Sequence, residues 1–195
     1  MTMTIGLFAF SEMEMLDFAG PYQVFSTASA VTNAQTGQDL FEMVTISPSQ
    51  EAVTVRSGAV LLPQATIADH PRLDCLIIPG GMTGVDPLIE EGPVVDWIAA
   101  QADSVPLIAT VCTGAFLLAQ TGLLNGLEAT THQDRTDQLR RRFPDITVIE
   151  QRRWVDCGRF VTAAGLSAGI DMTLHLVERL ADRDLAVATA RAMEL

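Results

Sequence analysis

The stretch that decides the fold is residues 105–119, which read VPLIATVCTGAFLLA. Its first half is a short apolar run rich in β-branched residues, and such a run predicts a buried parallel strand. From Thr113 onward the small and apolar residues predict a helix that ends at Gly122. Cys112 is therefore expected where a strand turns directly into a helix.

The corner at Cys112 has chemical consequences for a thiol. The first turn of a helix leaves backbone N–H groups unpaired and carries partial positive charge, so it stabilises a thiolate and lowers the thiol pKa. The same amides can hold an oxyanion that forms when the thiolate attacks a carbon atom. The alternative is that Cys112 is a small residue of the hydrophobic core, because free cysteine is among the most buried side chains. On this stretch alone, both interpretations carry equal weight.

Length and composition predict one domain over residues 1–195. A chain of 195 residues and 21.0 kDa, 48% hydrophobic, can bury one sizeable core but is short for two full domains. No apolar run reaches the roughly 18 residues of a membrane span. The N-terminus has no basic region and no signal-peptide pattern, so we expect a cytoplasmic protein without membrane contact. Three widely spaced cysteines indicate free thiols, and neither a disulfide framework nor a zinc site.

The charge distribution is strongly acidic, with a formal net charge of −12. Such a surface repels phosphate backbones, so we expect no nucleic-acid partner for this chain. All twelve basic residues are arginines, and seven of them fall between positions 135 and 159. We interpret this segment as a solvated face that pairs with carboxylates, with contact to a partner as the alternative.

Strands that alternate with helical segments predict an α/β fold with a mainly parallel sheet covered on both faces. A small antiparallel excursion is expected over 53–62, and a surface loop over 31–40. We expect strands over 4–10, 41–47, 73–78, 106–111, 128–132, 146–149, 153–155 and 159–162, and helices over 21–30, 87–103, 113–122, 134–142, 167–180 and 182–193.

Four polar or glycine positions follow predicted strands and are expected at one edge of the sheet. Asp17 lies in the connection after the first strand, Gly80 and Gly81 end the strand from 73, and His132 closes another strand. Ligands bind at the carboxyl edge of open α/β sheets, so these residues should meet Cys112 there. Together they supply a nucleophile, an acid/base and backbone amides. The alternatives are a helix cap for Asp17 and a plain turn for the two glycines.

Five motifs, in this order along almost the whole chain, resemble those of the ThiJ/PfpI superfamily. The resemblance implies a flavodoxin-like three-layer sandwich related to the class I glutamine amidotransferase domain, a nucleophile-elbow cysteine at Cys112, and usually a homodimer. The matching residues are 16–21 (LDFAGP), 78–81 (IPGG), 110–114 (TVCTG), 129–132 (ATTH) and 168–171 (AGID).

Within this superfamily, two positions are most similar to the isocyanide hydratases. Protease-like members carry histidine directly after the cysteine, where this chain has Thr113, and many members carry glutamate where it has Asp17. The similarity implies addition of water to an isonitrile, with no cofactor and no metal. It implies catalytic roles for Cys112, Asp17 and Thr113, and oxyanion or substrate contacts for Gly80, Gly81, Met82 and His132.

Three other functions remain open from the sequence. A glyoxalase-like enzyme would use the same thiol on α-oxoaldehydes, and an exposed acidic cysteine would suit a redox sensor. The N-terminal domains of certain AraC-type regulators share these motifs but precede a helix-turn-helix domain, which is not expected here before Leu195. We favour the enzyme because both Cys112 and Asp17 are present.

Overall fold

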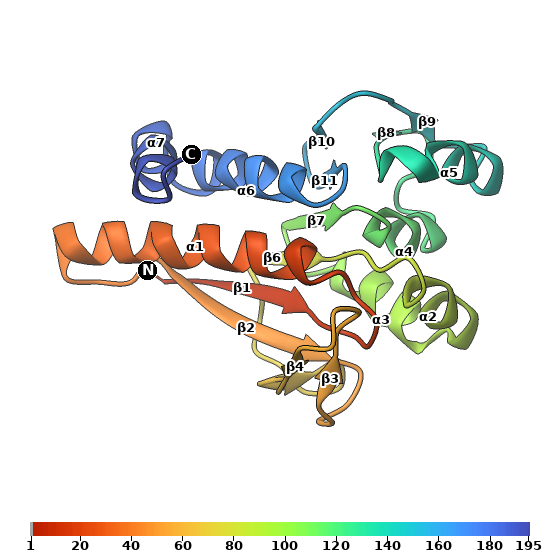
Figure 1. Ribbon diagram of the computed structural model, residues 1–195, viewed down its shortest axis with the longest axis horizontal. Coiled ribbons are helices and arrows are strands. Elements are labelled where there is room, and N and C mark those ends of the chain that lie inside the picture. The colour runs from red at the N-terminus through yellow and green to blue at the C-terminus, as the bar shows by residue number, and fades with distance from the viewer. Residues whose placement is uncertain (1) are drawn as a thin grey trace.

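A seven-stranded sheet forms the centre of the computed structural model, which describes residues 2–195. Met1, the first residue of the N-terminus analysed above, lies outside them. The two strands at one edge, residues 154–157 and 160–163, pair antiparallel, and all other neighbouring strands in the sheet pair parallel. Across the sheet the order is β10 (Trp154–Cys157), β11 (Phe160–Ala163), β7 (Leu107–Val111), β6 (Cys75–Ile78), β1 (Met3–Phe8), β2 (Phe41–Ser47) and β5 (Ala65–Thr66) (Figure 1).

Helices cover both faces of this sheet. Along one side lie α1 (Met15–Thr36), α6 (Ser167–Leu180) and α7 (Arg183–Ala192), packed against one another (Figure 1). The other layer contains α2 (Val85–Glu91), α3 (Pro93–Gln101) and α4 (Gly114–Gln120), which also pack together. The predicted flavodoxin-like three-layer sandwich is thereby confirmed.

Smaller elements surround the sheet. The hairpin of β3 (Val53–Thr54) and β4 (Val60–Leu61) is antiparallel, as expected from the sequence. A separate parallel pair joins β8 (Glu128–Ala129) to β9 (Thr147–Val148). The chain between them forms the short 3-10 helix η1 (Gln133–Arg135) and α5 (Thr136–Arg142).

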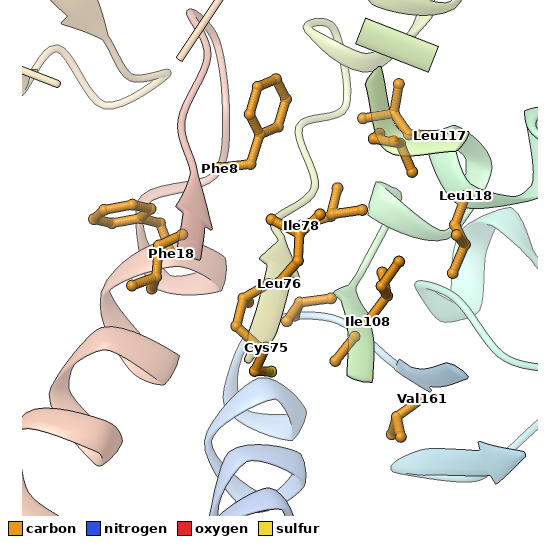
Figure 2. Packing of buried hydrophobic residues seen from close by; sticks show 14 of the residues in the cluster. Phe8, Phe18, Cys75, Leu76, Ile78, Ile108, Leu117, Leu118 and Val161 are labelled. Atoms are coloured by element: carbon orange, nitrogen blue, oxygen red, sulfur yellow. The ribbon is translucent and has the colours of Figure 1, made fainter. Parts of the chain in front are cut away.

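The core is built on the two central strands, β6 and β7, in which every residue is buried. Parallel strands need apolar side chains on both faces because helices cover both, which explains the unbroken apolar runs of these two segments. Figure 2 shows these strands, with their neighbours and α4, contributing to one cluster. Its labelled members include Phe8, Leu76, Ile78, Ile108, Leu117, Leu118 and Val161.

The first helix is longer at both ends than the predicted 21–30. It begins at Met15, so Asp17 lies in its first turn and Pro21 lies inside it. It continues to Thr36 and ends at Gly37, whose φ of 73° lets its N–H donate to Asn33 O at 2.7 Å. The predicted surface loop over 31–40 is therefore wrong for its first six residues. A glycine in the left-handed region directly after a helix commonly ends that helix. Gly37 could therefore have been identified as the helix end from the sequence.

Two further predictions are corrected. The helix expected over 87–103 is two helices, because Gly92 has a φ of 90° and Pro93 starts α3. The strand expected over 128–132 covers only β8 and lies outside the central sheet. His132 does not end a strand but caps η1, where its side chain accepts the Asp134 N–H.

Residues 2–195 contain neither a membrane-spanning helix nor a cluster of metal-ligating side chains. No helix there is long and apolar enough to cross a membrane. The same residues hold no cluster of three or more His, Cys, Asp or Glu side chains suited to a metal ion.

The hydroxyl of Thr110 on β7 is buried and has no hydrogen-bond partner within residues 2–195. We predict that Thr110→Val raises the free energy of unfolding by about 1 kcal/mol, because it removes an unsatisfied polar group and keeps a similar shape. Urea unfolding measures this change.

The matched control is Thr162→Val on β11, whose residue lies opposite Thr110 in the sheet register. This hydroxyl is equally buried but accepts the Thr130 N–H at 2.8 Å, so its removal should destabilise the fold. Equal destabilisation by both substitutions would contradict the assignment.

Candidate active site

Cys112 occupies a sharp turn between β7 and α4, which confirms the expected strand-to-helix corner. Its φ is 56°, in the left-handed region that non-glycine residues rarely adopt. Backbone strain of this kind persists only where the surroundings impose it. Here the Cys112 N–H is shared between Ala163 O (3.1 Å) and Ala164 O (3.3 Å). The Cys112 carbonyl accepts the Thr131 hydroxyl at 2.8 Å.

Two glycines allow the loop after β6 to touch this turn. A Cβ atom on Gly80 would lie 2.6 Å from Thr113 N and 2.8 Å from Cys112 Cβ. A Cβ atom on Gly114 would lie 2.4 Å from the Ile78 carbonyl oxygen. No real Cβ atom tolerates such distances, so any larger residue would separate the loop from Cys112. Gly80, the first glycine of the predicted Gly80-Gly81 turn, is thus required for this close approach.

The Asp17 side chain is fully buried and connects three segments distant in sequence. Its Oδ1 accepts the Leu166 N–H at 2.9 Å, and its Oδ2 accepts the Gly80 N–H at 3.3 Å. The Cys112 thiol lies close enough to the same carboxyl to influence its pKa. None of these partners belongs to α1 itself, so the helix-cap alternative is wrong.

Thr113 contacts the sulfur from the helix side. Its backbone N–H and its hydroxyl both act to lower the pKa of the Cys112 thiol. The hydroxyl oxygen also accepts the Gly81 N–H at 2.9 Å, which fixes its orientation. The amides of Gly80 and Gly81, expected to face an oxyanion, therefore already donate to Asp17 and Thr113. Met82 lines a pocket of about 10 Å³ beside Gly81 and Thr113, no larger than the space of one water molecule.

The titration of the pair differs from the sequence prediction. Burial raises the pKa of the Asp17 carboxyl to about 6. Burial, and next the Asp17 charge, raise the pKa of the Cys112 thiol to about 12, against the smaller opposing effect of the Thr113 amide and hydroxyl. The depressed thiol pKa expected from the helix start is therefore wrong for the resting pair. Two groups coupled this closely titrate as a unit, and above pH 6 they hold one proton between them.

His132 makes no hydrogen bond to Asp17 or Cys112 within residues 2–195. Its ring packs against Gly165, where a Cβ atom would lie 2.4 Å from His132 Cδ2. Its side chain is 23% exposed and lines a cleft of about 530 Å³. The lining of this cleft also includes Thr131, Ala164 and Leu166, whose backbone or side-chain groups hydrogen-bond to Cys112 or Asp17.

The residues that hold the pair were only partly predictable. Thr131 lies in the predicted strand 128–132 directly before His132, so its position at the site had a sequence signal. Leu166 contributes a backbone N–H, which any residue but proline supplies, so nothing in its identity pointed to the site. Met15 and Phe18, close to Asp17 in sequence, line a separate groove between α1 and β4.

A protein-family model described as the DJ-1/PfpI family matches residues 3–179. The isonitrile hydratase of Pseudomonas putida is 35% identical over 187 residues, which cover 95% of this chain and 75% of that protein. The HTH-type transcriptional regulator GbdR of Pseudomonas aeruginosa is 31% identical over 172 residues, which cover 86% of this chain but 46% of the regulator.

Among solved structures, a ThiJ/PfpI family protein from Pseudomonas syringae superposes with a TM-score of 0.87 at 27% identity. The superposition covers 100% of this chain and 75% of that one. The family model, the relatives and the fold agree with one another. The chain belongs to the DJ-1/PfpI (ThiJ/PfpI) family.

Proposed function

We propose that this chain adds water to an isonitrile through a covalent adduct on Cys112, giving an N-substituted formamide. The observation that carries the proposal is the burial of Asp17 and Cys112 side by side, close enough that each shifts the pKa of the other and the pair holds one proton near neutral pH. Isonitrile hydration needs a nucleophile and a proton delivered to the same carbon atom. A thiol and a carboxyl in direct contact can provide both at one place. The similarity to an isonitrile hydratase over 95% of the chain supports the same reaction.

In the first half of the reaction, the Cys112 sulfur bonds to the isonitrile carbon as its proton passes to the Asp17 carboxylate. The Asp17 carboxyl then delivers that proton to the same carbon. The product of these steps is a thioimidate, in which carbon carries one hydrogen, a double bond to nitrogen and a single bond to sulfur. Asp17 is again a carboxylate.

In the second half, water attacks the thioimidate carbon while Asp17 takes a proton from it and passes that proton to nitrogen. The carbon–sulfur bond then breaks, and the hydroxyl proton of the adduct returns to sulfur. One water molecule is consumed in total. Its oxygen becomes the formamide oxygen, and the thiol is regenerated.

The neighbouring groups have separate proposed roles. The Thr113 amide and hydroxyl stabilise negative charge on sulfur when Cys112 reacts. Gly80 and Gly81 orient Asp17 and Thr113 through their N–H groups. His132 and the cleft beside it receive the rest of the substrate.

Ligand sensing without turnover is a second candidate, favoured by the similarity to GbdR. A sensor needs a pocket but has no use for a nucleophile in contact with a proton carrier. The same thiol on an α-oxoaldehyde would be a third outcome. Turnover assays separate the three functions. A sensor would turn over neither class of substrate, and an α-oxoaldehyde enzyme would turn over aldehydes but not isonitriles.

We also propose that the chain forms a homodimer. Leu62, Val60 and Leu16 are apolar side chains with exposed fractions of 77%, 60% and 39%. Leu62 shares a groove of about 380 Å³ with Met15 and Phe18 of α1. Exposed apolar side chains beside an apolar groove commonly mark an interface, and a second copy of this chain would cover Leu62 and this groove.

The proposed reaction predicts that the purified protein hydrates cyclohexyl isocyanide and that Cys112→Ser abolishes turnover. Asp17→Asn should lower the rate by about 10²–10⁴-fold, the usual contribution of a general acid–base, while substrate still raises its melting temperature. Formamide release measured by chromatography gives the rates. Cys157→Ser, a half-buried cysteine distant in sequence, is the matched thiol control and should keep activity.

Two outcomes would replace this function by another. Turnover of methylglyoxal with none on several isonitriles would establish the aldehyde chemistry. No turnover on either class, with ligands stabilising the parent and Asp17→Asn equally, would favour the sensor.

The shared proton predicts a pH dependence with a definite sign. Below pH 6 both Asp17 and Cys112 are protonated, so no base is present to accept the thiol proton. We expect kcat/KM to fall as the pH drops through about 6, with the shape of a single-proton titration, and to stay level at higher pH. The residual rate of Asp17→Asn should lack this acidic limb. A limb of equal size in that variant would assign the titration to another group.

The homodimer predicts that Leu62→Glu lowers the mass measured by sedimentation equilibrium to that of one chain, because a buried charge would oppose association. Val187→Glu on α7 makes the same change at a residue that is 51% exposed, outside the groove, and should leave the mass unchanged. A parent protein that sediments as a monomer would refute the dimer.

A further inference from the structure

The cleft beside His132 has a mixed lining, in which polar and charged side chains lie beside apolar ones. Gln133, Thr136 and residues 150–153 supply much of its polar part. The lining also includes Thr131 and Leu166, which hydrogen-bond to Cys112 and Asp17. The proposed function puts the reactive carbon of the substrate at Cys112 and its remaining atoms in this cleft.

Most charges around the cleft are paired with each other. Glu150 pairs with Arg140 at 2.5 Å, and Arg153 pairs with Asp171 and also donates to the Ser167 hydroxyl at 3.2 Å. These contacts confirm that part of the arginine-rich segment pairs with carboxylates, as the sequence suggested. Arg152 is different, because its exposed guanidinium makes no hydrogen bond or ion pair to any residue in the described range 2–195.

The surroundings of Arg152 favour an anion more than the rest of the surface does. Residues 130–171 contain seven arginines and six carboxylates, whereas the remainder of the chain contains five arginines and eighteen carboxylates. An anionic molecule is therefore repelled less by this segment, which supplies every lining residue of the cleft, than by the rest of the chain. A guanidinium without a protein partner can bind a carboxylate through two parallel hydrogen bonds.

We propose that the substrate carries a carboxylate, and that Arg152, which lines the cleft, binds this carboxylate. This inference rests on the proposed function, because it names the class of isonitrile that the site accepts. The isonitrile group reaches Cys112, while the opposite end of the molecule reaches Arg152. Arg152 is then a specificity residue that acts on binding and leaves the chemistry at sulfur to the Asp17–Cys112 pair.

The test compares ω-isocyano carboxylates of increasing chain length with their neutral methyl esters. For at least one chain length, kcat/KM of the parent should be about tenfold or more higher for the carboxylate than for its ester, as expected for a hydrogen-bonded charge pair. In Arg152→Gln this ratio should fall to near one, and added salt should lower it in the parent. Arg141→Gln removes a charge from the same segment outside the cleft lining and should keep the parental ratio.

The outcomes separate this inference from the proposed function. If the esters are hydrated and the ratio is near one at every length, or unaffected by Arg152→Gln, the carboxylate assignment is wrong and the hydratase stands. If neither series is hydrated, the hydratase fails. In that case, binding of the ω-formamido carboxylates and of their esters, measured by calorimetry, tests the carboxylate inference independently of turnover. Tighter carboxylate binding that Arg152→Gln abolishes would support it, and equal binding would overturn it.

Discussion

The rest of the site depends on one contact, a carboxyl group buried against a thiol. Neither group can ionise freely out of water, because burial penalises the charged form of both. The pKa of Asp17 therefore rises to about 6 and that of Cys112 to about 12, and the two hold one proton over the neutral range. Three elements must meet to maintain this arrangement: the first turn of α1, the loop after β6 and the start of α6.

Holding the pair imposes a cost on the backbone around it. Cys112 adopts a left-handed φ. Its N–H donates to the carbonyls of Ala163 and Ala164, and its own carbonyl accepts the Thr131 hydroxyl, so its peptide groups are fixed on both sides. Strain of this kind is retained where the packed surroundings over-determine it. The central strands supply that rigidity, because β6 and β7 are buried along their whole length. The strained backbone at Cys112 therefore depends on the packing of the hydrophobic core.

Family membership leaves the function of an individual chain open, since the relatives include an enzyme and a transcription regulator. The differences must lie in the groups near the shared corner. In this chain Asp17 and Cys112 can exchange a proton, and the neighbouring cleft presents Arg152 without a protein partner among the described residues. The first feature bears on the reaction type, and the second bears on what the substrate carries.

The sequence by itself determined the α/β class, the buried central strands and the strand-to-helix corner at Cys112, because apolar runs and the cysteine's place among them are local patterns. It also placed Asp17, Gly80 and Gly81 at one edge, since parallel strands present their carboxyl ends together. Only the tertiary structure decided the thiol pKa. A helix start lowers it, but burial and the Asp17 charge outweigh that effect, and both depend on neighbours distant in sequence. Leu166 also could not be identified from the sequence. It contributes a backbone N–H to Asp17, and its position there depends on the tertiary structure and not on its side chain.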